Sequence, residues 1–256
     1  ILFLSLSFYA QESTAPENVT TFDIFSPELK VQKKIWVYLP KDYDNSDKNF
    51  PVIYMHDAQN LFDKKTSFAG EWEVDETLNK MNAQLIIIGI EHGNDKRIDE
   101  LTPFTNEKYG GGNGENYVRF IIKTLKPKVD SLYRTKSNAK NTAIFGSSLG
   151  GLISFYAVIK HPNVFGKAGV FSPSFWFSDE VYSLMEKSET SKAKIFFLCG
   201  NKENETMVSD LKKMQTLLDR NRCYCLKLNK TVIVKDGEHN EKLWKENFEH
   251  AVKWLF

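Results

Sequence analysis

Short apolar runs follow one another along the chain, each separated from the next by a longer segment of mixed character. The run at 85–90, Leu-Ile-Ile-Ile-Gly-Ile, is apolar at almost every position, as in a central strand that is buried on both faces. The other runs are also rich in β-branched and aromatic residues, which favour strands. Strands are predicted at 34–39, 52–55, 85–90, 142–145, 168–171, 195–199 and 226–234.

The segments between these runs have the spacing of apolar residues that is typical of amphipathic helices. Helices are predicted at 73–81, 117–133, 149–160, 206–221 and 242–255. This alternation indicates an α/β fold, with a mostly parallel central sheet and helices on both of its faces. No repeat or low-complexity linker interrupts the pattern, so residues 11–256 are predicted to form one domain without a large cap domain.

The first ten residues, ILFLSLSFYA, are uncharged and apolar, and polar residues follow at once. This stretch is too short to span a bilayer, but it has the length of the apolar part of a signal peptide, and Ala10 suits a cleavage site. Residues 1–10 are therefore interpreted as a truncated signal peptide, with an apolar edge strand as the alternative. The expectation is an exported protein, periplasmic or secreted, with no membrane attachment after cleavage.

Composition narrows the class of partner. The chain has 34 Lys and Arg against 33 Asp and Glu, a formal charge of +1, which leaves no strong basic field to hold nucleic acid. Cys199, Cys223 and Cys225 are too few for a disulfide scaffold or a four-ligand zinc site. They are interpreted as thiols, and the redox state of Cys223 and Cys225 stays open. The expected partner is a small or neutral molecule.

The strongest motif follows the predicted strand at 142–145, and parallel sheets carry their sites at the carboxyl ends of strands. Gly146-Ser-Ser-Leu-Gly150 has the form G-x-S-x-G and stands between a predicted strand and a predicted helix. A turn this sharp excludes side chains at Gly146 and Gly150, and it raises Ser148, in a strained conformation, to the mouth of the sheet. Ser148 is the candidate nucleophile, with a glycine-rich turn capped by serine as the alternative.

A serine nucleophile needs an imidazole base and a carboxylate that orients the base. His239 stands between the last predicted strand and the last predicted helix, where the chain order Ser, acid, His places the base. Glu203, three residues beyond Gly200 at the end of a predicted strand, is the preferred acid. Glu205 and Asp236 remain alternative acids, and a helix-capping role is the alternative for His239.

The oxyanion of an acyl-transfer reaction needs two backbone N–H donors. Leu149, directly after the candidate nucleophile, is the first predicted donor. The second is Gln59, with Ala58 in reserve, in the loop after the strand at 52–55. Asp57 and Ala58 of the same loop are expected to line the substrate site, because small Ala58 lets a substrate approach the backbone.

Aromatic and glycine-rich segments near strand ends complete the candidate site. Trp72 and Trp176 are candidates for stacking on a phenolic or sugar group, with a place in the core as the equal alternative. The stretch 109–114, Tyr-Gly-Gly-Gly-Asn-Gly, lacks the preceding strand and the Gly-Lys ending of a phosphate-binding loop, and is interpreted as a loop near the cleft. Glu91 and His92 are adjacent and point in different directions, so a metal site there is disfavoured.

Four segments together resemble the putative esterase family of α/β-hydrolases: 55–63 (MHDAQNLFD), 146–151 (GSSLGG), 165–173 (FGKAGVFSP) and 237–240 (GEHN). That family includes feruloyl and acetyl xylan esterases, enterochelin esterases, S-formylglutathione hydrolase and mycolyltransferases, and the resemblance runs from about Lys33 to Phe256. It implies an α/β-hydrolase fold, with Ser148 as nucleophile, Glu203 as acid, His239 as base, and Gln59 and Leu149 as oxyanion donors.

The implied reaction is acyl transfer through an acyl-enzyme, which requires no metal and no cofactor. The predicted function is a serine carboxylic ester hydrolase that acts on an acylated carbohydrate or a phenolic ester. The alternatives are a siderophore esterase, an acyltransferase with the same catalytic residues and, from another class, a non-catalytic binding module on the same fold. The oligomeric state stays open.

Overall fold

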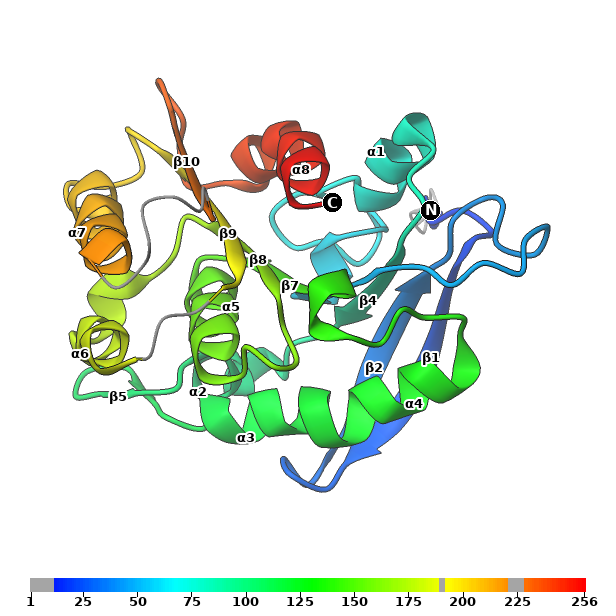
Figure 1. Ribbon diagram of the computed structural model, residues 1–256, viewed down its shortest axis with the longest axis horizontal. Coiled ribbons are helices and arrows are strands. Elements are labelled where there is room, and N and C mark those ends of the chain that lie inside the picture. Colours follow the sequence, from blue (N-terminus) through cyan, green and yellow to red (C-terminus); the bar gives the residue numbers. More distant parts are fainter. Residues whose placement is uncertain (1–11, 189–191, 221–227) are drawn as a thin grey trace, which may run out of the picture.

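The computed structural model describes residues 12–188, 192–220 and 228–256, and its centre is one large sheet with the strand order β1-β2-β4-β3-β7-β8-β9-β10 (Figure 1). The proposed signal peptide and Cys223 and Cys225 lie outside these residues. The strands are β1 (Val19–Ser26), β2 (Val31–Tyr38), β3 (Val52–His56), β4 (Ile86–Ile90), β7 (Thr142–Ser147), β8 (Lys167–Phe171), β9 (Lys194–Gly200) and β10 (Asn229–Val234). A separate two-stranded sheet pairs β5 (Thr105–Asn106) with β6 (Gly110–Gly111).

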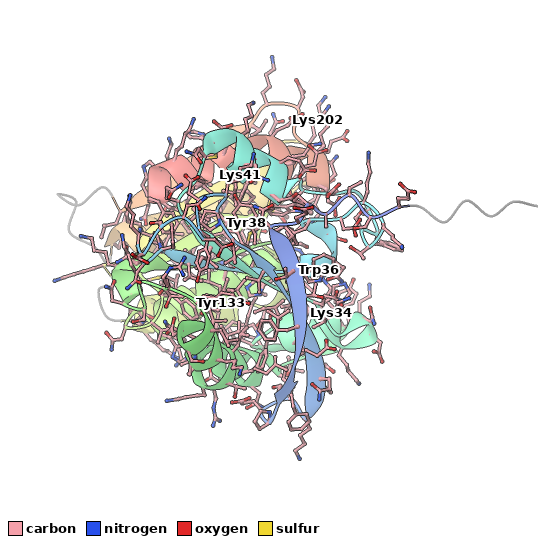
Figure 2. The ribbon with its side chains drawn as sticks, turned by 90° about the vertical axis from the view of Figure 1, so that its right-hand side faces the viewer. Lys34, Trp36, Tyr38, Lys41, Tyr133 and Lys202 are labelled. Atoms are coloured by element: carbon pink, nitrogen blue, oxygen red, sulfur yellow. The ribbon has the colours of Figure 1, made fainter. Side chains whose placement is uncertain are left out.

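The strands from β4 to β10 in this order are mutually parallel, whereas β2 runs antiparallel to both β1 and β4. The predicted α/β fold with a mostly parallel sheet is therefore confirmed. Figure 2 looks at the antiparallel edge, where Lys34, Trp36 and Tyr38 of β2 are labelled. β1 was not predicted, because an edge strand that is half exposed carries polar residues among its apolar ones.

Helices cover both faces of the sheet, as the sequence predicts. Figure 1 shows α1 and α8 on the upper side and α3 and α4 on the lower side. Along β3, Ile53 and Met55 pack in the core cluster beneath α1 and α8, and Val52 and Tyr54 pack in the opposite cluster, because successive residues of a strand face opposite ways. The helices are α1 (Val74–Met81), α2 (Arg97–Leu101), α3 (Gly114–Phe120), α4 (Lys126–Leu132), α5 (Leu149–Lys160), α6 (Glu180–Lys187), α7 (Met207–Arg220) and α8 (Glu241–Leu255).

The helix predicted at 117–133 is one helical segment with a change of pitch in the middle. A π-helical turn, Ile121–Leu125, joins α3 to α4, and Pro127 falls in the first turn of α4. A proline lacks the N–H that an uninterrupted α-helix would use, so a wider turn directly before it relieves the mismatch. Within the described residues, no helix combines the length and the apolar character needed to cross a membrane.

The register of the sheet brings several strand ends to one edge. Ser147 at the end of β7 pairs with Phe171 at the end of β8, which in turn pairs with Leu198 of β9. Val234, the last residue of β10, pairs with Gly200, the last of β9. The loops that follow these four strands therefore leave the sheet side by side, and these are the loops that carry the candidate residues.

Candidate active site

Ser148 occupies a strained turn between β7 and α5. Its backbone has φ 57° and ψ −120°, a conformation that L-residues rarely adopt. A Cβ at Gly146 would lie 2.6 Å from the carbonyl carbon of Gly150, and one at Gly151 would lie 2.7 Å from the carbonyl oxygen of Phe171. A Cβ at Gly150 would make only ordinary contacts, so the collision expected there occurs at Gly151 instead.

The hydroxyl of Ser148 hydrogen-bonds a second serine. Its Oγ lies 3.2 Å from Oγ of Ser174, a buried residue shortly after β8. The backbone N–H of Ser174 also donates to the carbonyl of Ser148, at 3.1 Å. Among the described residues, no imidazole forms a hydrogen bond with Ser148 Oγ. Ser148 and His239 nevertheless line the same pocket, which has a volume of about 660 Å³.

Glu203 and His239 are in direct contact. Nδ1 of His239 lies 2.7 Å from Oε2 of Glu203; the Glu203 side chain is fully buried and that of His239 is 36% exposed. A neutral imidazole whose Nδ1–H is donated to a carboxylate keeps Nε2 as its proton acceptor. The pair therefore has the tautomer that a general base next to a serine requires.

A relay of hydrogen bonds fixes the Glu203 carboxylate from behind. Its Oε1 accepts from the backbone N–H of Gly200 at 2.5 Å and from Oγ of Ser172 at 2.7 Å. Ser172, with φ 43°, accepts in turn from Nε1 of Trp244 at 2.8 Å. The ring of Trp244 also packs edge-on against His239, with centroids 5.1 Å apart. Both members of the Glu203–His239 pair are thus held by the same tryptophan.

The two alternative acids lie elsewhere. Asp236 forms an exposed ion pair with Lys202, at 2.8 Å. Glu205 is exposed, just before the start of α7. Of the three candidate acids, all of them within the described part of the chain, only Glu203 contacts His239.

The predicted oxyanion donors both stand at helix starts. Gln59 belongs to a short 3₁₀ helix, Ala58–Asn60, and Leu149 is the first residue of α5. The first N–H groups of a helix have no acceptor within it, so both groups are available to a ligand. Asp57, in the left-handed conformation with φ 57°, turns the chain into the 3₁₀ helix. Ala58 is buried against Gly89, outside the residues that line the pocket.

Asp57 lines the pocket and forms an ion pair with Arg97. Nε and Nη2 of Arg97 each donate to a carboxylate oxygen of Asp57, both at 2.8 Å. Burial raises the pKa of Asp57, but the charge and hydrogen bonds of Arg97 outweigh burial and leave that pKa below its ordinary value. The pairing of Arg97 with Asp57 was not predicted from the sequence, because 40 residues separate the two.

His56 is buried behind this wall and is not a base for Ser148. Its Nδ1 lies 2.8 Å from the hydroxyl of Tyr117, and its Nε2 lies 3.1 Å from Oγ of Ser154. Burial lowers the pKa of His56 to about 4, so its ring is neutral at physiological pH. It supports the loop that carries Asp57.

The two tryptophans singled out in the sequence have different surroundings. Trp72 is buried, stacked on Phe171 with centroids 5.7 Å apart, and also lines the pocket. Trp176 is 48% exposed, packs edge-on against Tyr109, and is not among the residues that line the pocket. The glycine-rich stretch at 109–114 forms β6 and the start of α3, and likewise does not line the pocket.

Ser172, Ser174 and Phe68 are further site residues that the sequence analysis did not single out. Both serines follow the carboxyl end of β8, so a search of the residues directly after that strand could have found them. Phe68 lines the pocket mouth and is 96% exposed, and no local pattern marks such a residue. The geometry therefore brings together a serine at a strained turn, an imidazole held by a buried carboxylate, and the N–H group of Gln59 at one pocket, with the N–H group of Leu149 next to the serine.

Comparison with known proteins places this geometry in a family. The sequence matches the family model described as "Putative esterase" over residues 26–255. It is 26% identical over 242 residues to the uncharacterized protein YbbA of Bacillus subtilis (strain 168), covering 88% of this chain and 92% of YbbA. It is 24% identical over 197 residues to the endo-1,4-beta-xylanase/feruloyl esterase of Xylanibacter ruminicola, covering 73% of this chain and 25% of that protein.

A solved structure shows the same fold. The enterobactin esterase FES from Shigella flexneri, determined in the presence of enterobactin, superposes with a TM-score of 0.78 at 19% sequence identity. The match covers 95% of this chain and 60% of that one. The sheet of the described residues is thus of the α/β-hydrolase type. Because the family model covers nearly the whole chain, the protein belongs to the putative esterase family and is a carboxylic ester hydrolase.

Proposed function

We propose that the protein hydrolyses esters through an acyl-enzyme, with Ser148 as nucleophile, His239 as general base and Glu203 as the acid that orients the base. The contact between Glu203 and Nδ1 of His239, at 2.7 Å within the pocket that Ser148 also lines, carries the proposal. A carboxylate in this position holds the imidazole in the reactive tautomer and stabilises the imidazolium that forms during the reaction.

The first step forms the acyl-enzyme. Nε2 of His239 accepts the proton of Ser148 as Oγ bonds to the ester carbonyl carbon, and the backbone N–H groups of Gln59 and Leu149 donate to the oxyanion. The tetrahedral intermediate collapses when the imidazolium gives this proton to the departing alcohol. In the second step, water attacks the acyl carbon while His239 takes its proton, and the carboxylic acid leaves as that proton returns to Ser148.

The hydrogen bond between Ser148 and Ser174 describes the resting state of the nucleophile. Rotation about a side-chain single bond between staggered positions moves a hydroxyl at small energetic cost. We infer that Oγ of Ser148 turns from Ser174 toward His239 when a substrate enters. In structures without a substrate, catalytic hydrogen bonds are often long or not yet formed.

We propose an acylated carbohydrate or phenolic ester as the substrate. The exposed ring of Phe68 lines the pocket and suits stacking on a phenolic acyl group or a sugar face, and the buried ring of Trp72 forms part of the apolar wall. Asn60 and Arg97 line the same pocket and supply polar contacts. One relative carries a feruloyl esterase in its name, which agrees with this class.

Two measurements test the chemistry. The wild-type protein should hydrolyse p-nitrophenyl acetate and be labelled by a fluorophosphonate at Ser148, and Ser148→Ala should abolish both while keeping the circular dichroism spectrum. Absence of labelling and of hydrolysis in the folded wild-type protein would identify a binding module and refute the catalytic proposal.

A substrate panel tests the specificity. Methyl ferulate, acetylated xylan, a ferric catecholate siderophore and S-formylglutathione are compared by kcat/KM, with methyl ferulate or acetylated xylan expected to rank first. Phe68→Ala should lower kcat/KM for methyl ferulate more than for ethyl acetate, because only the former offers a ring. A siderophore that ranks first contradicts the substrate class, and net acyl transfer to an added alcohol in preference to water identifies an acyltransferase.

A further inference from the structure

Three carboxylates converge beside the pocket wall, outside the proposed catalytic residues. Glu71 lies in the loop before α1, and Asp75 and Glu76 lie in the first turn of that helix. One oxygen from each of Glu71, Asp75 and Glu76 lies within 4.8 Å of the other two. Figure 1 shows α1 next to α8 at the upper side of the sheet.

Two of the converging carboxylates each have a buried oxygen without a hydrogen-bond partner. Oδ1 of Asp75 and Oε1 of Glu71 are inaccessible to solvent and contact no donor. The residues are 1% and 9% exposed, respectively. A buried carboxylate oxygen without a donor is strongly unfavourable, and such orphaned atoms in native proteins often mark a bound ion.

The charge of Lys64 acts on Glu71, but no ion pair within the described part of the chain compensates this cluster. None of the ion pairs that the described residues form involves Glu71, Asp75 or Glu76, and the nearby Lys245 pairs with Glu73 instead. The amino-terminal end of α1 favours negative charge, but its effect is only about 0.3–1 kcal/mol for each group and does not extend to the orphaned oxygen of Glu71 in the preceding loop. One bound cation would compensate the negative charge of all three carboxylates.

We propose that Glu71, Asp75 and Glu76 bind a calcium ion. Calcium accepts six to eight oxygen ligands at about 2.3–2.6 Å, so its opposite ligands lie up to about 5 Å apart. Magnesium usually keeps several of its waters and binds only one or two carboxylates, so three carboxylates supplied by the protein favour calcium. Glu76 is exposed, which leaves one side of the ion open to water ligands.

The position of the ion assigns it a role in fixing the pocket wall. Glu71 directly precedes Trp72, whose N–H donates to the carbonyl of Asn60 at 2.8 Å. Thr66 and Phe68 of the same loop hydrogen-bond Gln59 and Asn60. Calcium would tie this loop to α1, and thereby steady the segment that carries the proposed oxyanion donor. This inference does not rest on the proposed catalytic mechanism.

Protonation of the carboxylates is the alternative to a bound calcium ion, because it too would remove the repulsion between them. Burial, with the neighbouring carboxylates as a further cause, raises the pKa of Asp75 to about 8 and that of Glu71 to about 7. A cluster relieved by protons would lose stability as the pH rises from the ordinary carboxyl pKa toward these values, and it would show no response to metal ions. The experiment is therefore carried out at pH 8.5, where the two explanations differ most.

The test uses protein stripped with EDTA and then titrated with CaCl₂ or TbCl₃. We expect calcium at about 100 times its Kd to raise the Tm by roughly 5–10 °C. Bound terbium should show luminescence sensitised by Trp72, next to a ligand, and calcium should displace it. Glu76→Gln, at an exposed position that tolerates change, should weaken calcium binding at least about tenfold, and Asp75→Asn should abolish the shift in Tm.

Glu73→Gln is the matched control, because it removes one carboxylate from the same segment but lies outside the cluster. Its calcium-dependent shift in Tm should equal that of the wild-type protein. An unchanged Tm together with absent terbium luminescence overturns the proposal. So does a calcium response that Glu76→Gln and Glu73→Gln alter equally, and an equal shift with MgCl₂ overturns the assignment to calcium.

Discussion

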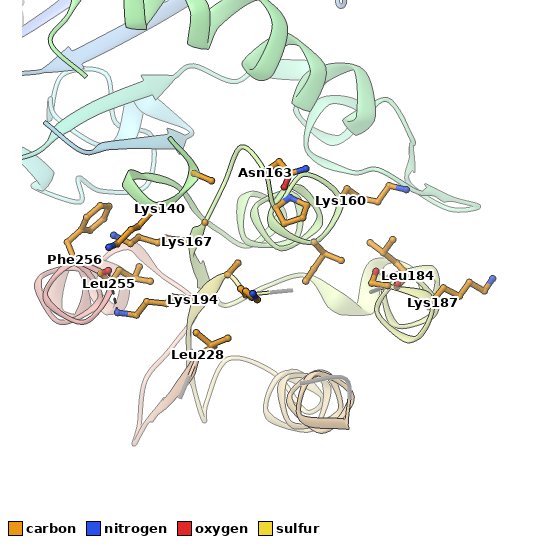
Figure 3. A pocket seen from close by; sticks show the side chains of 17 residues that line it. Lys140, Lys160, Asn163, Lys167, Leu184, Lys187, Lys194, Leu228, Leu255 and Phe256 are labelled. Atoms are coloured by element: carbon orange, nitrogen blue, oxygen red, sulfur yellow. Dashed lines mark hydrogen bonds between the residues drawn. The ribbon is translucent and has the colours of Figure 1, made fainter. Parts of the chain in front are cut away.

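The two ends of β8 and β9 carry different kinds of polar residue. At their carboxyl ends, Ser172 and Glu203 form the hydrogen-bonded support behind His239, which lines the same pocket as Ser148. At their amino ends, Lys167 and Lys194 line a second cavity of about 1150 Å³ (Figure 3). Among the described residues that line it, none is acidic and six are lysines: Lys140, Lys160, Lys167, Lys187, Lys192 and Lys194. The larger cavity is thus at the end of the sheet where parallel folds do not place their catalytic residues.

The two cavities differ in whether their charged side chains have partners of opposite charge. In the catalytic pocket, Glu203 is paired with His239 and Asp57 with Arg97. In the lysine cavity, burial, followed by the charges of Lys194 and Lys140, lowers the pKa of Lys167 to about 8. Size therefore does not identify the reactive site. A strained backbone and oriented charge pairs mark the proposed site, and these occur together at the carboxyl ends.

Replacement of the nucleophile gives the largest expected contrast. Ser148→Ala should lower kcat by about 10⁵- to 10⁶-fold, because loss of the nucleophile removes the covalent route. Lys167→Met, at the opposite end of the sheet, should retain wild-type kcat and KM. Hydrolysis of p-nitrophenyl acetate measures both. Substantial activity in Ser148→Ala, or its loss in Lys167→Met, would remove the functional distinction between the two cavities.

The acid is the next test within the catalytic pocket. Glu203→Gln should lower kcat by about 10⁴-fold, because an amide neither stabilises the imidazolium nor fixes its tautomer. Glu205→Gln, two residues further along the chain and exposed, is the matched control and should change kcat less than about twofold. Similar losses in the two variants would reject Glu203 as the acid.

Much of this arrangement follows from local patterns in the sequence. β4 was predicted because five consecutive buried residues require an apolar run, and the turn at Ser148 because its glycines and its serine are neighbours in the chain. The relay behind Glu203 escaped prediction, because 72 residues separate Ser172 from Trp244. Spacing along the chain does not encode such contacts; the packing of α8 against β8 and β9 creates them.

Breaking the hydrogen bonds that link Trp244, Ser172 and Glu203 should lower kcat less than replacing Glu203 itself. Ser172→Ala removes one of the two hydrogen bonds to Oε1 of Glu203 and should lower kcat roughly tenfold, the consequence of losing about 1.4 kcal/mol of charge-assisted hydrogen bonding. KM should stay within about twofold, since Ser172 does not line the pocket. Trp244→Phe keeps the aromatic packing and removes only the donor to Ser172, so it should show a weaker loss of kcat. A change confined to KM would contradict a positioning role.

The lysine cavity offers the smallest effect, on stability alone. The pKa of Lys167 in the folded protein, about 8, lies below its ordinary value of 10.5, so between these values the unfolded chain binds more protons. The free-energy cost of burying the charged Lys167 side chain is complete below about pH 8, and it decreases as the pH rises toward 10.5. Lys167→Met should therefore raise the Tm at pH 7 by roughly 2–4 °C, the shift expected for about 1 kcal/mol.

The advantage of Lys167→Met over the wild-type protein should shrink as the pH is raised from 7 to 10, because deprotonation relieves the same penalty in the wild-type protein. Lys187→Met, an exposed lysine of the same cavity, is the control and should shift the Tm by less than about 2 °C at every pH. Differential scanning calorimetry across this range measures both curves. A difference in Tm between Lys167→Met and the wild-type protein that stays constant or grows with pH would contradict this prediction. It would show that the ring of Phe256, 3.8 Å from Nζ of Lys167, stabilises the buried ammonium. The charges at the two ends of β8 would then be equally well compensated.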